Sequence, residues 1–590
     1  MKHDFCLGIC ATWQTLLTRE IGEYTPPDCE FNRVTINLTV TSAGRQFDRL
    51  ALMFLDDIEV FRTSTAEPTR KGIIWSYLKD MSLYLTLFKK RHKMIFDLGN
   101  LVDETYTGLW NTTLTATFFS ADETFQPADV IVPVSAQGSA RNDSSAFTVP
   151  ENRAISILKV PQNARKAVFS ISACGQAAEE FWWSNVLSSD TGVFGDDATL
   201  YGHSPFRELQ LLIDGKLAGV AWPFPVIFTG GIVPGFWRPI VGIDAFDLRE
   251  DEIDISPFLP LLTDDELHTF EIRVIGLDDD GRGNANFTER IESNWVVTGK
   301  IFFWLDPDTG TVTGAAPTIR IRNPLPKVHS TRQLDPNGSV QSLNYSIQVS
   351  RQLYVEATLH TSNGLEIVTW QQNLEFSNSG TLGNKGNNQV MRQSTSGTHH
   401  SSTGFLRTFE YPLWVVSAYE LRPGGNLTIN GTMGRGKYVQ QVGDLAFPNE
   451  WKSLDPIRSL RRHSGWSFSG SNINNWQNGT ASYTSIPAEK RVYGTGNTEQ
   501  LFTLTGINID PIAVVQDGTN EVVTTKKTSE ELYRRHVVAA NDSIVYDEEK
   551  LGSQRIGRGR LTTTRKLDTV ARMHEFAGEG PRALLGRGPY

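Results

Sequence analysis

One segment near the N-terminus places two carboxylates close to arginines, a pattern that can support hydrolysis. It runs from Asp48-Arg49 through Arg62 to Glu67, whose conformation is restricted to the extended region by the following Pro68. A carboxylate can activate water as a general base, and an arginine can stabilise an oxyanion or lower a neighbouring carboxyl pKa. This segment is therefore a candidate for the reacting groups.

A second candidate segment, Glu-Glu-Phe-Trp-Trp-Ser-Asn at 179–185, combines carboxylates with aromatic side chains. Aromatic faces such as that of Trp183 can stack on sugar rings, while Glu180 and Asn185 can bond hydroxyl groups. The ordinary alternative is a surface ion pair at Asp48-Arg49 and a core position for the tryptophans, because strands offer such pairs often.

Other catalytic signatures are missing from the sequence. The four cysteines lie in the atypical N-terminus (Cys6 and Cys10), in a loop (Cys29) and in a strand-end segment without a nearby histidine (Cys174), which disfavours thiol catalysis. A disulfide between the last two remains an option. The sequence contains no GxSxG, HExxH or paired CxxC motif, which disfavours the simplest hydrolase and zinc-site interpretations. The acidic run at 278–289 has loose calcium-loop spacing, but an arginine at a ligand position favours a solvated turn.

The elements that must position these residues are mostly short strands rich in β-branched and aromatic residues, which predicts an all-β fold. Helical periodicity is limited to 73–90 and 529–540. The segment from Phe47 repeats in outline from Phe206 as strand, acidic turn and strand, which favours tandem jelly-roll-like β-sandwiches followed by a further polar β-rich domain.

The expected divisions follow composition and texture. They are an atypical N-terminus at 1–23, a first β-sandwich at 24–150, a second at 151–312, a C-terminal β-rich domain at 313–548 with a low-complexity loop at 377–404 that contains His399 and His400, and a disordered Gly/Arg-rich tail at 549–590.

Composition narrows the class of partner. The chain has 590 residues and a net charge of −10, so several domains are expected, and neither nucleic acid nor an anionic membrane is an implied partner. No apolar run reaches the roughly 18 residues of a membrane span. The first twenty residues are not a convincing signal peptide, yet Asn-x-Ser/Thr sequons such as those at Asn142, Asn286, Asn337 and Asn430 suit a secreted protein.

Several long stretches resemble the peptide-N4-(N-acetyl-β-glucosaminyl)asparagine amidase A family of plants and fungi. They cover most of residues 24–545 and include RTSTAEPT, EEFWWSN, PFPVIFTGGI and PGFWRPIVGIDAFDL. The resemblance implies a secreted glycoamidase that needs no cofactor, acts on N-glycosylated peptides and glycoproteins, releases the intact glycan and converts asparagine to aspartate. A non-catalytic glycan-binding or cell-surface protein, or a glycosidase that cuts between sugars, remains the alternative.

The resemblance also implies site residues. The chain is more distantly similar to bacterial peptide-N-glycosidase F, whose catalytic aspartate precedes an arginine at a strand start, as Asp48 precedes Arg49 here. A carboxylate expected shortly before Phe206-Arg207 is replaced by His203, which leaves the second catalytic group open. We expect catalytic roles for Asp48, Glu180 and Glu67, and substrate binding by Arg49, Arg62, Trp183, Asn185, His203 and Arg207.

Overall fold

The first fifth of the chain folds into two four-stranded sheets that pack face to face. The computed structural model describes residues 6–555 except 15–18, 122–125, 309, 323, 450–467, 490, 517–518 and 553. One sheet has the order β1-β8-β3-β6 and the other β2-β7-β4-β5. Their strands are β1 (Cys6–Gln14), β2 (Arg19–Tyr24), β3 (Arg33–Ser42), β4 (Leu50–Leu55), β5 (Ile58–Ser64), β6 (Ile73–Asp80), β7 (His92–Leu98) and β8 (Asn111–Phe119).

The second unit repeats this strand order. Its sheets are β10-β18-β12-β15 and β11-β16-β13-β14, so each strand takes the place of its counterpart, with β9 and β17 added. The strands are β9 (Val130–Val134), β10 (Phe147–Val149), β11 (Ala154–Lys159), β12 (Ala164–Gln176), β13 (Glu208–Ile213), β14 (Lys216–Ala221), β15 (Asp251–Asp254), β16 (Leu267–Asp279), β17 (Ala285–Thr288) and β18 (Asn294–Leu305). The matching hairpins β4–β5 and β13–β14 turn at Asp56 and Asp214, both with positive φ. The expected all-β fold with tandem jelly rolls is confirmed.

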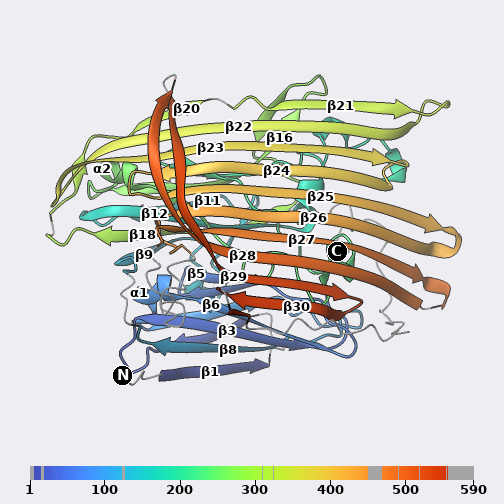
Figure 1. The fold of residues 1–590 in the computed structure, drawn as a ribbon, viewed down its shortest axis with the longest axis horizontal. Coiled ribbons are helices and arrows are strands. Elements are labelled where there is room, and N and C mark those ends of the chain that lie inside the picture. The colour runs from blue at the N-terminus through green and yellow to red at the C-terminus, as the bar shows by residue number, and fades with distance from the viewer. Residues whose placement is uncertain are drawn as a thin grey trace.

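The rest of the chain forms one sheet of 13 described strands. They are β19 (Thr313–Gly314), β20 (Thr318–Arg322), β21 (Lys327–Leu334), β22 (Val340–Thr361), β23 (Gly364–Gly383), β24 (Asn388–Ser401), β25 (Leu406–Arg422), β26 (Asn426–Val442), β27 (Gly470–Ile486), β28 (Arg491–Gln516), β29 (Thr519–Ala540), β30 (Ser543–Leu551) and β31 (Gln554–Arg555). The long strands lie side by side as a broad layer, with the first sandwich at its lower edge (Figure 1).

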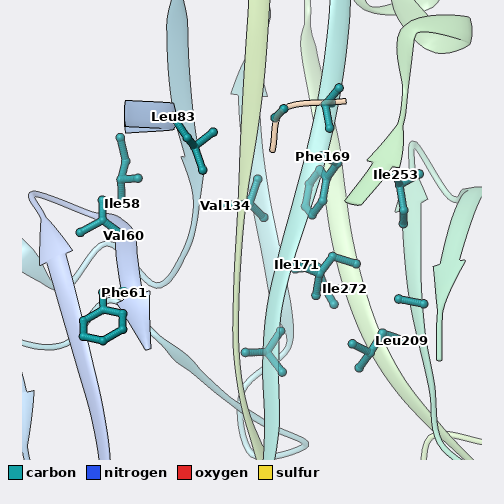
Figure 2. Close-up of a cluster of buried hydrophobic side chains, with 14 of the residues drawn as sticks. Ile58, Val60, Phe61, Leu83, Val134, Phe169, Ile171, Leu209, Ile253 and Ile272 are labelled. Atoms are coloured by element: carbon teal, nitrogen blue, oxygen red, sulfur yellow. The ribbon is translucent and has the colours of Figure 1, made fainter. Parts of the chain in front are cut away.

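An apolar core joins the two sandwiches. The same buried cluster contains Ile58 and Val60 of β5, Val134 of β9, and Phe169 and Ile171 of β12 (Figure 2). Burying such side chains contributes roughly 1.5–3 kcal/mol each. The contact between the sandwiches therefore fixes the loops at their junction.

Both expected helices are wrong in the main. Residues 73–80 form β6, in which Ile74 and Leu78 are exposed at 72% and 65% and alternate with inward side chains. Within 73–90, Ser82–Tyr84 forms a 3-10 helix and Leu85–Phe88 forms a short α-helix, α1. Residues 529–540 belong to β29, where pairing with β28 and β30 outweighs local helix propensity.

The expected low-complexity loop at 377–404 is also wrong, since it consists of parts of β23 and β24. Some of its polar side chains form hydrogen bonds with one another in a buried layer. Asn378 Nδ2 donates to Gln393 Oε1 at 3.0 Å, and buried His399 lies 3.1 Å from Gln372 Nε2. Burial lowers the pKa of His399 to about 3, so it is not a solvated histidine.

Three further expectations concern the termini and the cysteines. β1 and β2 belong to the first sandwich, which therefore begins before residue 24. The tail expected to be disordered begins at residue 549, but residues 549–551 belong to β30 and 554–555 to β31, so disorder is wrong for this part. The rest of the tail, from 556 onward, lies outside the described residues. Cys29 and Cys174 are not joined to each other by a disulfide.

Candidate active site

The open end of the β4–β5 hairpin brings Asp48 and Glu67 together. Leu50 of β4 pairs with Ser64 of β5, and the pairing continues one residue further. There Thr65 N donates to Arg49 O at 2.9 Å, and Arg49 N donates to Thr65 Oγ1 at 2.8 Å. Asp48 and Glu67 therefore lie just beyond this extra pair, one on each side of the hairpin.

A loop of the second sandwich closes over the two carboxylates. Thr229, which follows β14, accepts a hydrogen bond from Glu67 N at 2.9 Å and donates to Thr65 O at 3.3 Å. A Cβ atom added to Gly230 would lie 2.6 Å from Glu67 Oε1 and 3.0 Å from Asp48 Oδ1. Glycine is therefore required, and its N–H reaches the Asp48 carboxylate.

Glu180 approaches the same place from the second sandwich. It follows β12 and the short 3-10 helix Ala177–Glu179. Glu179 anchors this turn, because its carboxylate bonds Arg207 at 2.6 and 2.7 Å and Trp295 Nε1 at 2.8 Å. Glu180 keeps partial exposure, and its carboxyl group feels the charges of Asp48 and Glu67.

The three acids of this carboxyl cluster (Asp48, Glu67 and Glu180) differ in how far their surroundings raise their pKa values. Burial raises the pKa of Asp48 to about 6, although Arg49 and the Gly230 N–H oppose the rise. Burial and then the Asp48 charge raise the pKa of Glu67 to about 7. Burial and the other two carboxylates raise the pKa of Glu180 well above its ordinary value. At mildly acidic pH the cluster can therefore offer a base and an acid together.

Three arginines supply positive charge around the cluster. Arg238 Nη2 lies 3.7 Å from Glu67 Oε2, and Arg238 and Arg45 both lower the pKa of Glu67. The Arg49 guanidinium is held by Gln46 Oε1 at 2.9 and 3.2 Å. These cations limit the repulsion between carboxylates and can face developing negative charge on a substrate.

Two of the expected substrate-binding arginines serve buried ion pairs instead. Arg62 bonds both Glu59 oxygens at 2.8 Å and donates to Val296 O at 2.8 Å, which links the sandwiches. Arg207 pairs with Glu179, and neither arginine is more than 2% exposed. The structure does not bring them into the carboxyl cluster.

Arg49 borders the cluster, whereas the three remaining expected binding residues lie apart from it. Trp183 is 1% exposed, and Asn185 donates to Gly202 O at 3.1 Å inside the second sandwich. His203 Nδ1 lies 2.6 Å from Asp278. Their placement supports structural roles, and the assignment of site roles from sequence remains a prediction.

Sequence reasoning did not single out Thr229, Gly230, Arg238 and Arg45. The signal for the first two was the Thr-Gly-Gly step inside PFPVIFTGGI, which follows a strand of the second sandwich. Their partners lie more than 160 residues away, so only the docking of the sandwiches reveals the contact. In the described part of the chain, no group of three or more His, Cys, Asp or Glu is arranged to hold a metal ion.

Two protein-family models match this chain. The model described as peptide N-acetyl-beta-D-glucosaminyl asparaginase amidase A matches residues 5–320, and the PNGase_A C-terminal domain matches residues 344–413. The chain belongs to the amidase A family. The resemblance seen in the sequence is confirmed, and the three segments that form the carboxyl cluster all lie inside the first match.

One named relative agrees with membership of the amidase A family, and two solved structures align with about half of the chain. Peptide-N4-(N-acetyl-beta-glucosaminyl)asparagine amidase A of Prunus dulcis is 30% identical over 478 residues, covering 75% of this chain and 78% of its own. PNGase F of Flavobacterium meningosepticum, a glycosylasparaginase, aligns at 11% identity and a TM-score of 0.31, covering 52% of this chain and 96% of its own. PNGF-II aligns at 12% identity and a TM-score of 0.32, covering 49% of this chain and 60% of its own. Among the described residues, no helix is long and apolar enough to cross a membrane.

Proposed function

We propose that this protein is a glycoamidase that hydrolyses the amide bond between an asparagine side chain and the first sugar of an N-glycan. The observation that carries the proposal is the carboxyl cluster, in which both sandwiches contribute acids of different pKa to one place. Amide hydrolysis needs a base for water and an acid for the leaving nitrogen. Membership of the amidase A family supplies the substrate class, N-glycosylated peptides and glycoproteins.

Asp48 is the general base in this proposal. Its ionised form accepts the Gly230 N–H and lies beside Arg49, so it stays charged at a lower pH than its neighbours. It takes one proton from a water molecule, whose oxygen bonds to the side-chain amide carbon. Arg49 and Arg238 face the negative charge that develops on the amide oxygen.

Glu180 is the acid in this proposal. Glu67 is 8% exposed, whereas Glu180 is less deeply buried and lines a cavity that can hold substrate. A proton from Glu180 passes to the amide nitrogen as the carbon–nitrogen bond breaks. The products are an aspartate side chain and a glycosylamine, and Glu180 recovers the proton that Asp48 removed from water. The charge of Glu67 helps to keep the pKa of Glu180 raised.

A defined glycopeptide tests the reaction. Incubation with the purified protein at pH 5–6, followed by mass spectrometry, should show the peptide with aspartate in place of the glycosylated asparagine, together with an intact glycan. A peptide that keeps one sugar would instead indicate a glycosidase. Binding without any product would favour a non-catalytic glycan-binding protein.

We also propose that the protein is secreted. Asn142, Asn286, Asn337 and Asn430 each begin a sequon and are exposed, so they are accessible to glycosylation. Expression of the chain in its own host, followed by glycopeptide mapping of the culture medium, should find glycans on these residues. Unmodified protein confined to the cells would contradict this.

A further inference from the structure

A cavity of about 410 Å³ opens beside the carboxyl cluster, where the two sandwiches meet the large sheet. The first sandwich contributes Tyr77 to its lining, and the second contributes Glu180 and Trp182. The large 13-stranded sheet, which we call the third sheet, contributes Lys437 and Arg407. Its volume lies in the range of roughly 300–1,000 Å³ that is usual for small-ligand pockets. The cavity therefore extends the site beyond the reacting groups.

The cavity lining includes both exposed and buried residues. Leu78 is 65% exposed and the Arg249 side chain 49%, whereas Trp182 and Trp295 are exposed by only 5% and 1%. An extended ligand seated on Glu180 can therefore reach solvent past the exposed part of the lining.

Aromatic faces and polar groups alternate along the walls. Lys437 Nζ lies 5.2 Å from the centre of the Phe224 ring and forms an ion pair with Asp244. Arg407 donates to Tyr411 Oη at 3.0 Å, and its buried Nε has no hydrogen-bond partner in the described structure. Aromatic rings together with donors and acceptors are the surface that a sugar requires, because one face of a pyranose is apolar and its rim carries hydroxyls.

The charge of the lining disfavours an anionic ligand. Seven acidic and four basic side chains line the cavity, so positive charge is not in excess. Lys79 and Arg249 both face Asp247, and Lys437 faces Asp244. Because these cations are already paired, an anionic ligand would gain little and would meet the remaining carboxylates.

We propose that this cavity is a subsite for the neutral core sugars of the glycan beyond the scissile bond, and that Lys437 and Asp244 determine how well those sugars bind. The inference rests on the proposed glycoamidase function for the placement of the first sugar. It adds that the third sheet takes part in substrate recognition.

The double variant Lys437→Met/Asp244→Asn tests this subsite, because it removes the ion pair without leaving one charge buried alone. The matched control is Arg422→Met/Glu420→Gln, which removes an exposed 2.9 Å pair on the neighbouring strand, outside the cavity. Each is assayed on two glycopeptides, one with a single N-acetylglucosamine and one with the neutral core pentasaccharide. Equal urea midpoints establish that both variants fold.

For the double variant we expect kcat/KM on the core glycopeptide to fall by at least about ten-fold, mainly through KM, as expected when hydrogen bonds to charged groups are lost. Turnover of the single-sugar peptide should stay within about two-fold, equivalent to a small fraction of that free energy. The control should match wild type on both. Equal losses on both substrates, or no loss on either, would overturn the subsite.

Direct binding separates the subsite from the reaction. Free N,N′-diacetylchitobiose is titrated against wild type, Asp48→Asn and the double variant by calorimetry or ligand-observed NMR. Binding to the first two and at least about ten-fold weaker binding to the third supports the subsite. If wild type binds the sugar but releases no aspartyl peptide, the proposed function fails and the subsite stands. Equal binding by all three proteins, or no binding to wild type, overturns the subsite.

Discussion

Adjacent glutamates at 179 and 180 are driven in opposite directions by their surroundings. Burial alone would raise both pKa values, but the Arg207 ion pair outweighs burial at Glu179 and holds its pKa below the ordinary value. Glu180 has two carboxylates as its charged neighbours, and its pKa rises well above the ordinary value. The first residue is an anchor, and the second is suited to donate a proton.

Replacing Asp48 by Asn should remove the base while keeping the shape of the side chain. We expect kcat to fall by roughly 10²–10⁴-fold, the usual contribution of a general base. The urea midpoint should not fall, because the raised pKa means that burying the ionised Asp48 costs folding free energy, and asparagine carries no charge. Asp196→Asn, at an exposed position in the second sandwich, is the control and should behave as wild type. Near-normal turnover by Asp48→Asn would exclude this residue as the base.

The carboxyl cluster also predicts the pH dependence of catalysis. Because Asp48 must be ionised and its pKa is about 6, kcat/KM should rise with pH through that value. It should fall at higher pH as the cluster loses the proton it must donate. Removing Arg238 by substitution with methionine should raise the pKa of Glu67, since this arginine lowers it. Because the Glu67 charge raises the pKa of the Glu180 acid, a Glu67 that stays neutral to higher pH lets Glu180 lose its proton at lower pH. Rate profiles from pH 4 to 9 should therefore show the descending limb at lower pH in Arg238→Met, and an unchanged limb would argue against the coupling.

Individual acids could be identified from the sequence, but their environment could not. Asp48, Glu67 and Glu180 stand beside arginines, aromatics or a proline, and this local pattern is visible in the chain. Arg62 and Arg207 show the same pattern, yet their partners are the buried carboxylates Glu59 and Glu179. Which arginine meets an anchoring carboxylate and which a reacting one depends on contacts between distant segments.

At the scale of elements, the third sheet holds the loop that completes the carboxyl cluster. The 3-10 helix Pro234–Trp237 lies between Gly230 and Arg238 and packs on β27 and β28. Thr498 Oγ1 of β28 donates to Phe236 O at 2.6 Å, and Gln477 Nε2 of β27 donates to Val241 O at 2.8 Å. The sheet therefore fixes both ends of the segment that carries Arg238.

Thr498→Val should loosen this segment, because it keeps the volume and removes the buried donor. We expect a loss of about 1–3 kcal/mol in unfolding free energy, from the carbonyl left unsatisfied. We also expect kcat to fall and Thr498→Ser to restore it. Thr381→Val, which removes an exposed hydroxyl bonded to Asn344 on the same sheet, is the control. Stability loss with unchanged kcat in Thr498→Val would show that the sheet only supports the fold.

The type of each element could be predicted from the sequence where side chains alternate in polarity. The prediction was wrong where pairing between strands determined the structure. The β4–β5 and β13–β14 hairpins carry acidic turns between apolar strands, and both form as expected. In β24 the buried positions include Gln389, Gln393 and Thr395, so the polar composition suggested a loop. Gln393 Oε1 accepts a hydrogen bond from Asn378 on β23, and Gln389 donates to Ser184 O of the second sandwich, so these contacts depend on distant segments.

For the whole molecule, concentrating raised carboxyl pKa values at one junction makes stability depend on pH. A carboxyl with a folded pKa above its unfolded value stabilises the fold fully below the unfolded pKa. That contribution is lost as pH rises through the folded pKa. For Glu67 the window runs from 4.5 to about 7. The cluster therefore stabilises the docked sandwiches at acidic pH relative to neutral pH.

Glu67→Gln should remove this dependence, because the amide stays neutral. The stability of wild type relative to the variant should decline between pH 4.5 and 7.5 by about 1.4 kcal/mol for each unit of pKa shift. Urea unfolding at several pH values measures the difference. Glu104→Gln, at an exposed position, should track wild type throughout. A difference that stays constant with pH would contradict the raised pKa.

The most direct test of the account is the position of the oxygen that water delivers. The central claim is that Asp48 directs water to the amide carbon of the glycosylated asparagine. Incubation of a defined glycopeptide in heavy-oxygen water should place one heavy oxygen in the new aspartate side chain of the peptide, and Asp48→Asn should yield almost none. Heavy oxygen in the released sugar, with asparagine or one sugar still on the peptide, would contradict the claim.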